Sequence, residues 1–344
     1  MDDARFFACV LAGGSGERFW PMSRQAVPKH HLTLFGEATL LEQSVRRALR
    51  VAGVERTFVL TSQAQAEATR RLLPFLPADQ IVAEPSRRDT APAAALATAL
   101  ARNRREDAVV ALLPADALIR DGDTFAAQLR DAFTVAAERE ACATFAIRPR
   151  YPATAFGYIE VGAPAAGAFH QIARFVEKPD AARASSYLET GRFGWNAGIF
   201  VWSAAWFLAQ AEKSAPELAA FIRAGGPLDR FEQLPKISVD YAIMEKADRL
   251  LTAWAAFDWD DVGSWTALPD HLGQDEAGNT LRGPVVLGGG ASNNIAVAAG
   301  GRVIALHGVS GLVVVETPDA ILVCPKDKVQ EIKELQALLP PGLR

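Results

Sequence analysis

The sequence predicts an α/β protein with a mostly parallel, Rossmann-like sheet, helices on both of its faces, and a small C-terminal β-rich domain. Over the first half of the chain, short apolar runs alternate with amphipathic segments, which is typical of such a sheet. Beyond about Asn279 the pattern changes to short valine-rich runs broken by Gly, Asn and Pro. A chain of 344 residues, half of them hydrophobic, can bury a large core.

Seven apolar runs predict the strands of the large sheet. They cover 6–11, 57–62, 81–84, 108–113, 143–147, 156–161 and 172–177. Thr39 and Glu42 have the spacing of a capping box, which predicts a helix from there through Arg50. A second helix is expected to end near Leu73, and Thr90 can cap an alanine-rich third helix.

The valine-rich region after Asn279 predicts a β-helix-like fold that is closed by a helix at 326–339. We therefore expect one large α/β domain at 1–270 and the small domain at 279–344. The small domain could also supply the surface of a homodimer.

The charge balance excludes some classes of partner. Thirty-six basic and 40 acidic residues give a net charge of -4, so the chain lacks the basic footprint of a nucleic-acid-binding protein. The N-terminus is acidic where a signal peptide is basic, and we expect no membrane association. Cys9, Cys142 and Cys324 are widely spaced in apolar stretches, which indicates buried, reduced thiols and a cytoplasmic location.

A glycine-rich loop at 13–31 follows the first predicted strand and offers Arg18 and Lys29 as cations. It lacks the Gly-Lys-Ser/Thr ending of a Walker loop. It also lacks the third glycine of a dinucleotide fingerprint, because Phe19 stands there. Two interpretations remain: bare amides and cations that wrap a phosphate chain, or an ordinary glycine turn with solvated basic residues.

The loop segments LAGGSGERFWPMSR and PKHHLTLFG resemble the signature of sugar-nucleotide pyrophosphorylases, and are most similar to the mannose-1-phosphate guanylyltransferases. Further matching segments follow in order along nearly the whole chain: EPSRRDTAPAAALA, LLPADALI, FGYIEV, FVEKPD, WNAGIFVW, ISVDYAIME and FDWDDVGSW. Two segments depart from the family pattern. Ala117 stands where a histidine is usual, and the usual Thr-Gly-Tyr-Gly-Tyr turn reads TAFGY, with Ala155 and Phe156 at the changed positions.

The resemblance implies a nucleotidyltransferase reaction. Mannose 1-phosphate would attack the α-phosphorus of GTP in line, giving GDP-mannose and pyrophosphate. The alternatives are the same reaction with another sugar 1-phosphate or nucleoside triphosphate, and a catalytically silent sensor of nucleotide sugars.

The resemblance also implies which residues form the site. The nucleotide would bind Leu11, Ala12, Gly13, Gly14, Ser15, Gly16, Glu17, Arg18, Glu84 and Pro85. The sugar phosphate would bind Gly157, Glu177, Lys178 and Asn196. The catalytic residues would be Arg18, Lys29, Asp116, Lys178 and Asp261.

Asp116 and Asp261 are the candidate metal ligands. Asp116 follows a buried strand at its carboxyl end, where such sheets bind ligands, and two carboxylates with substrate phosphates suit Mg²⁺. Without the resemblance, a cap for Asp116 and a turn acid for Asp261 would be favoured. Asp260 is a rival ligand, but the family's motif places the ligand directly before Val262.

Two pairs of adjacent residues need separate interpretation. Strand alternation sends the side chains of Glu177 and Lys178 to opposite faces unless the chain bends there, so a simple ion pair is not expected. For His30 and His31, a packing or surface role is favoured over catalysis, since no other ligands cluster near them in the sequence.

Overall fold

The computed structural model describes residues 3–14 and 16–343, which form two compact units. The first unit comprises residues 1–13, 43–115 and 119–259, and the second comprises 14–42, 116–118 and 260–344. Both units are therefore built from segments that lie far apart in the sequence. The expected domain limits of 1–270 and 279–344 stay a prediction, because compactness alone does not define a folding unit.

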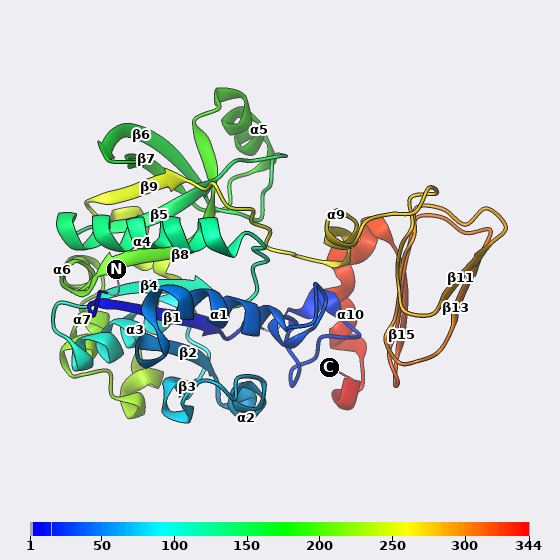
Figure 1. Ribbon diagram of the computed structural model, residues 1–344, viewed down its shortest axis with the longest axis horizontal. Helices are drawn as coiled ribbons and strands as arrows, with labels where there is room; N and C mark the ends of the chain where they lie inside the picture. Colours follow the sequence, from blue (N-terminus) through cyan, green and yellow to red (C-terminus); the bar gives the residue numbers. More distant parts are fainter. Residues whose placement is uncertain (1–2, 15, 344) are drawn as a thin grey trace. The chain divides into compact units, whose positions relative to one another are not determined.

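The first unit is a nine-stranded sheet in the order β3-β2-β1-β4-β8-β5-β9-β7-β6 (Figure 1). Strands β1 to β4 are mutually parallel neighbours, whereas β8 pairs antiparallel with both β4 and β5. The strands of this sheet are β1 (Phe6–Ala12), β2 (Thr57–Ser62), β3 (Ile81–Glu84), β4 (Val109–Pro114), β5 (Cys142–Ile147), β6 (Tyr158–Ala166), β7 (Phe169–Val176), β8 (Phe193–Ser203) and β9 (Leu250–Trp254). All seven predicted strands are present, and β8 and β9 complete the sheet.

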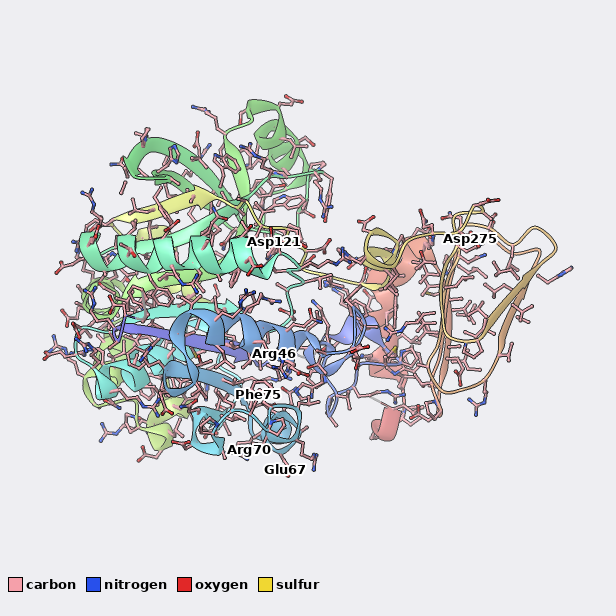
Figure 2. All side chains as sticks on the ribbon, in the orientation of Figure 1. Arg46, Glu67, Arg70, Phe75, Asp121 and Asp275 are labelled. Carbon is pink, nitrogen blue, oxygen red and sulfur yellow. The ribbon has the colours of Figure 1, made fainter. Side chains whose placement is uncertain are left out.

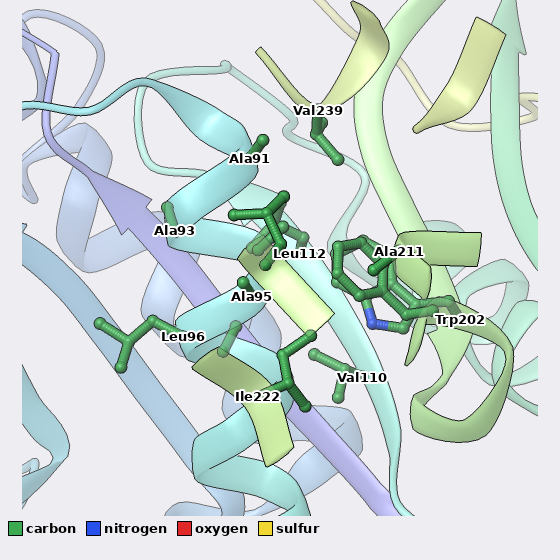
Figure 3. Close-up of a cluster of buried hydrophobic side chains, with 14 of the residues drawn as sticks. Ala91, Ala93, Ala95, Leu96, Val110, Leu112, Trp202, Ala211, Ile222 and Val239 are labelled. Carbon is green, nitrogen blue, oxygen red and sulfur yellow. The ribbon is translucent and has the colours of Figure 1, made fainter. Parts of the chain in front are cut away.

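Helices cover both faces of this sheet, as the sequence predicts. On β1, Phe6 stacks against Phe133 of α4, while Phe7 on the opposite face belongs to a core formed with the alanine-rich α3. Figure 3 shows that core, where Leu96 of α3 lies with Val110 of β4 and Ile222 of α7. The helices are α1 (Leu40–Ala52), α2 (Gln63–Leu72), α3 (Thr90–Arg104), α4 (Gly122–Arg139), α5 (Ala181–Thr190), α6 (Ala204–Ser214), α7 (Pro216–Arg223) and α8 (Val239–Ala242).

Local hydrogen bonds explain where the helices begin. The Thr39 hydroxyl accepts a hydrogen bond from the Glu42 amide at 3.1 Å, which confirms the expected cap of α1. Asp121, at the start of α4 in Figure 2, accepts one from the Thr124 amide at 3.0 Å. The expected Thr90 cap is wrong by one residue. Asp89 caps α3, and the Thr90 hydroxyl instead accepts a hydrogen bond from the Val239 amide.

The C-terminal part of the second unit has the stacked parallel pairings of a β-helix, β10–β12–β14 and β11–β13. Asn279 and Asn294 join its turns, because Asn279 Oδ1 accepts from the Asn294 amide and Asn294 Oδ1 accepts from the Leu312 amide, both at 3.0 Å. Asp275, labelled in Figure 2, accepts a hydrogen bond from the Asn279 amide. The elements are α9 (Leu268–Leu272), β10 (Thr280–Arg282), β11 (Val285–Gly288), β12 (Ile295–Ala298), β13 (Ile304–His307), β14 (Leu312–Glu316), β15 (Ile321–Pro325) and α10 (Ile332–Leu338).

Two of the three cysteines are buried, as their apolar surroundings predict. Cys9 and Cys142 are buried and reduced, as expected, but Cys324 is only half-buried because it lies on the edge strand β15. Within 3–14 and 16–343, no helix is both long and apolar enough to cross a membrane.

Candidate active site

The glycine-rich loop places Lys29 through a close backbone contact. Gly16 has φ of 63°, in the left-handed region, and a Cβ there would overlap the Cβ of Lys29. The Ser23 hydroxyl donates a hydrogen bond to the Gly16 carbonyl at 2.7 Å, which fixes the other side of the turn. Gly16 is therefore required by the packing of Lys29 as well as by its own conformation.

Changing Gly16 to alanine is expected to lower turnover at least about tenfold, because the new methyl group must displace Lys29 and the backbone is strained by about 1–3 kcal/mol. Steady-state turnover and the thermal midpoint would be measured together. Gly167→Ala is the matched control, since Gly167 also has a left-handed φ of 54° but a Cβ there meets no atom within 4 Å. Equal turnover of the two variants would show that Lys29 tolerates displacement.

Lys29 joins the two segments that carry the predicted acids. Its Nζ donates to Asp116 Oδ2 at 3.1 Å and to the backbone carbonyl of Asp261, and its side chain is only 7% exposed. Burial by itself would raise the pKa of Asp116, but the charge and hydrogen bond of Lys29 outweigh it and hold the pKa below its usual value. Lys29, Asp116 and Asp261 are thus brought together within the second unit.

The structure separates the roles of Asp260 and Asp261. Asp260 Oδ1 accepts a hydrogen bond from the Val262 amide at 2.7 Å, and Asp260 Oδ2 lies 3.1 Å from His271 Nε2. For the Asp261 carboxylate, no hydrogen-bond donor is found among residues 3–14 and 16–343. Burial raises its pKa to about 6; Lys29 opposes the rise, and the charges of Asp260 and Asp116 add to it. Asp261 is therefore the acid whose carboxylate has no hydrogen-bond donor among those residues, and the charges of Lys29 and Arg18 offset its burial only in part.

The turn that carries Asp261 is strained. Val262 has φ of 44°, an unusual value for a β-branched residue, and its side chain is completely buried in the core of the second unit. Such strain persists where surrounding packing enforces it, and it is common at functional sites. The buried Val262 side chain fixes the backbone from which the neighbouring Asp261 carboxylate projects.

Asp116 and Asp261 fit a hard cation by their chemistry. Both supply carboxylate oxygen, and the raised pKa of Asp261 indicates a carboxylate that a positive charge would stabilise. In the described part of the chain there is no group of three or more His, Cys, Asp or Glu that could hold a metal. A two-carboxylate site suits magnesium, which keeps waters and substrate phosphates as its other ligands.

Arg18 has the features of an anion-binding side chain. It lies in a short 3₁₀ turn, Glu17–Phe19, whose Phe19 is buried. Its Nε is buried, and no hydrogen-bond partner for that atom is present within 3–14 and 16–343. Because an unpaired buried donor is costly, a phosphate oxygen is a suitable partner for Arg18.

In the first unit, Glu84 ends β3 next to the start of the glycine-rich loop. A Cβ on Gly13 would lie 3.8 Å from Glu84 Oε2, in ordinary van der Waals contact, so this carboxylate lies beside the Gly13 backbone. Burial raises the pKa of Glu84 to about 7, and its buried Oε1 has no hydrogen-bond partner in the described part of the chain. Glu84 is thus an acceptor that a ligand donor could satisfy. Pro85 follows it directly.

The predicted sugar-phosphate residues cluster in the first unit. A Cβ on Gly157 would lie 2.5 Å from Glu177 Oε2, and the backbone amide of Asn196 donates a hydrogen bond to the Gly157 carbonyl at 2.8 Å. The expectation for Glu177 and Lys178 is wrong, since Lys178 Nζ lies 2.7 Å from Glu177 Oε1. Strand β7 ends at Val176, and φ of 44° at Lys178 turns the chain so that the two side chains converge.

Asp240 is a further acid in this cluster that sequence reasoning did not select. Its Oδ1 accepts a hydrogen bond from Asn196 Nδ2 at 3.3 Å. Burial, and then the charge of Glu177, raise its pKa to about 7. The motif ISVDYAIME contains this residue, and Ser238 of the same motif caps α8. Nothing in the spacing indicated that Asp240 would reach Asn196.

His30 and His31 have packing roles rather than surface ones. They are 2% and 8% exposed, and their rings form an edge contact with centroids 4.7 Å apart. Burial lowers the pKa of His31 to about 4, so this ring is neutral at pH 7.

The remaining predicted residues are placed as follows. Leu11 and Ala12 end β1, Gly14 is exposed, Glu17 begins the turn that carries Arg18, and Ser15 lies outside the described residues.

Known proteins match this chain along almost all of its length. Residues 7–277 match the nucleotidyl transferase family, and residues 291–338 match the MannoseP isomerase/GMP-like beta-helix domain. The xanthan biosynthesis protein XanB of Xanthomonas campestris pv. campestris (strain B100) is 37% identical over 339 residues, covering 95% of this chain and 71% of that protein. The mannose-1-phosphate guanylyltransferase of Klebsiella pneumoniae is 35% identical over 354 residues, covering 97% and 74%.

A solved structure agrees with these sequence matches. The crystal structure of a protein from Thermus thermophilus, titled mannose-1-phosphate geranyltransferase, superposes with a TM-score of 0.88 at 35% identity, covering 97% of this chain and 99% of that one. The α/β fold with its C-terminal β-helix is therefore confirmed. The chain belongs to the mannose-1-phosphate guanylyltransferases of the nucleotidyl transferase family.

Proposed function

We propose that this chain transfers GMP from GTP to mannose 1-phosphate, giving GDP-mannose and pyrophosphate. The observation that carries the proposal is the convergence of Lys29, Asp116 and Asp261, which unites a buried cation with two carboxylates. The names of the relatives support the choice of substrates.

In the proposed reaction, a phosphate oxygen of mannose 1-phosphate attacks the α-phosphorus of GTP. The new P–O bond forms as the bond from the α-phosphorus to the bridging oxygen breaks, and pyrophosphate leaves with that electron pair. No general base is needed, because the second pKa of a phosphate monoester is about 6 and the nucleophile is mostly a dianion at neutral pH. Burial lowers the pKa of His31 to about 4, so this ring would be a weak base, which agrees with the absence of a general base.

The protein's task is to position the anions and to offset their charge. Arg18 and Lys29 would bind the triphosphate, and Arg18 would stabilise the charge that grows on the leaving pyrophosphate. Asp116 and Asp261 would hold Mg²⁺, which supplies charge neutralisation at the phosphates. Lys178 would bind the sugar phosphate, and Glu177, Asn196 and Asp240 offer acceptors and a donor to sugar hydroxyls.

Two rival functions remain distinguishable: transfer to another sugar phosphate or from another nucleotide, and a silent sensor. Pyrophosphate release would be measured for GTP, ATP and UTP, each with mannose 1-phosphate and glucose 1-phosphate. We expect GTP with mannose 1-phosphate to give the highest kcat/KM. If UTP with glucose 1-phosphate is best, the substrate assignment is wrong; if no pair reacts although GTP binds, the sensor is correct.

A cytoplasmic location and a homodimer are further proposals. Exposed apolar side chains on the C-terminal β-helix support the dimer, namely Val286, Val303, Ile321 and Val323. The molar mass in solution would test it.

A further inference from the structure

The glycine-rich loop is part of the hydrophobic core of the C-terminal unit. Phe19 and Trp20 are buried there with Trp265, the β12 and β14 valines, and Ile332 of α10. The Phe19 and Trp265 rings make an edge contact with centroids 5.0 Å apart. The apolar residues of the loop therefore anchor the same segment that carries Arg18 and Lys29.

Hydrogen bonds to distant residues hold Trp20 of this loop and the segment that follows the loop. Trp265 Nε1 donates to the Trp20 carbonyl at 3.1 Å, and Trp20 Nε1 donates to the Leu343 carbonyl at 2.8 Å. Arg282 donates to the carbonyls of Thr33 and Leu34 at 2.5 and 2.8 Å. All of these donors and acceptors belong to the second unit.

A further hydrogen bond reaches the turn that carries Arg18. Gln336 of α10 donates from Nε2 to the Glu17 carbonyl at 3.0 Å, and Arg18 is the next residue. Glu17 and Arg18 belong to a three-residue 3₁₀ turn, which is too short to be rigid by itself. The direction of the Arg18 side chain therefore depends on what holds the turn.

We propose that the C-terminal segment 326–343 positions the triphosphate-binding turn, and that Gln336 is a positioning residue for Arg18. This rests on the proposed function, because Arg18 is assigned there to the departing pyrophosphate. Preorganised cations lower a barrier only if they are already aimed at the developing charge. Gln336 therefore acts on the chemical step through Arg18, without touching substrate.

The alternative is that the Gln336 bond only adds stability. A matched control separates the two, because Gln274 lies in the same unit and donates from Nε2 to the Gly278 carbonyl at 3.0 Å in a hydrogen bond that is exposed like that of Gln336. Gln336→Leu and Gln274→Leu each remove one glutamine-to-carbonyl hydrogen bond. Similar small losses of stability are expected, and only Gln336→Leu should change catalysis.

The test measures pyrophosphate release with GTP and mannose 1-phosphate for the wild type, both leucine variants, Arg18→Ala, and the double variant Arg18→Ala/Gln336→Leu. We expect Gln336→Leu to lower kcat about threefold to tenfold, the size of one hydrogen bond, with an unchanged KM for mannose 1-phosphate. In the Arg18→Ala background, Gln336→Leu should cause no further decrease, because residues that act through each other are not additive.

Two outcomes would overturn the inference. One is an unchanged kcat in Gln336→Leu, and the other is an equal fold-loss with and without Arg18. Failure of the proposed function is distinct, since the wild type itself would then release no pyrophosphate. If Gln336→Leu does not fold, Gln336→Asn, which shortens the donor, takes its place in the same comparison.

Discussion

Replacing Asp261 by asparagine is expected to lower kcat at least about a hundredfold, the scale of losing a key electrostatic group. The Asp261 carboxylate is half-buried beside other acids and near Lys29, and it projects from a strained turn. A cation is the partner that such a carboxylate lacks. Asp116→Asn should behave similarly, and both variants should need more Mg²⁺ for half-maximal rate. Pyrophosphate release over a range of Mg²⁺ concentrations measures both effects.

Asp260→Asn is the matched control for this prediction. The Asp260 carboxylate accepts from the Val262 amide and contacts His271, so its loss should lower the thermal midpoint and leave the Mg²⁺ requirement unchanged. If the Asp261 and Asp116 variants keep full activity in EDTA, no metal is held there. A raised Mg²⁺ requirement in Asp260→Asn would instead assign the ligand to Asp260.

The strands of the large sheet could be predicted because each is a short apolar run between turn signals. The structure adds β8 and β9, and β8 lies antiparallel between β4 and β5. The place of a strand in the sheet is set by long-range pairing, which leaves no local signal in a single sequence. The cap of α3 was predicted at Thr90 instead of Asp89 for a related reason. The Thr90 hydroxyl accepts a hydrogen bond from the amide of Val239, a residue distant in the chain.

The candidate site was predictable in its composition but only partly in its geometry. The resemblance selected Lys29, Asp116 and Asp261, and the fold brings these three together. Strand alternation failed for Lys178, because a left-handed residue reverses the direction of the chain there. Asp240 was not selected from the sequence, because its hydrogen-bond partner Asn196 lies on β8, 44 residues earlier in the chain.

The core contacts of the glycine-rich loop could not be predicted, because its partners lie far away in the sequence. Its glycines indicate close backbone approach, and Gly16 confirms this against Lys29. Its aromatic residues, Phe19 and Trp20, gave no hint that they would be buried with Ile332 near the far end of the chain. A loop with cations on one side and core residues on the other can hold those cations rigidly, which electrostatic catalysis requires.

Glu84→Gln is expected to reduce the preference for GTP over ATP about tenfold to a hundredfold. An ionised carboxylate can accept hydrogen bonds from both the N1–H and the N2 amino group of guanine, and each charge-assisted bond is worth about 1.5–3 kcal/mol. The amide of glutamine offers one acceptor and one donor, which fits one guanine donor and suits the adenine edge better. The measurement is the ratio of kcat/KM for GTP to that for ATP.

The same carboxylate predicts a pH dependence of that ratio. Burial raises the pKa of Glu84 to about 7 in the free protein, so the carboxylate is increasingly protonated as the pH falls below 7. The protonated acid loses an acceptor for guanine, and wild-type selectivity should therefore fall between about pH 8 and pH 6, whereas Glu84→Gln should show no such change. Ionisation of the triphosphates cancels in the ratio, because GTP and ATP share it. A raised pKa also means that the folded state binds this proton more tightly than the unfolded chain, so Glu84 costs stability above pH 7 and the glutamine variant should not unfold more easily at pH 8. Wild-type selectivity that stays constant across this range, with an unaltered ratio in Glu84→Gln, would place guanine recognition elsewhere.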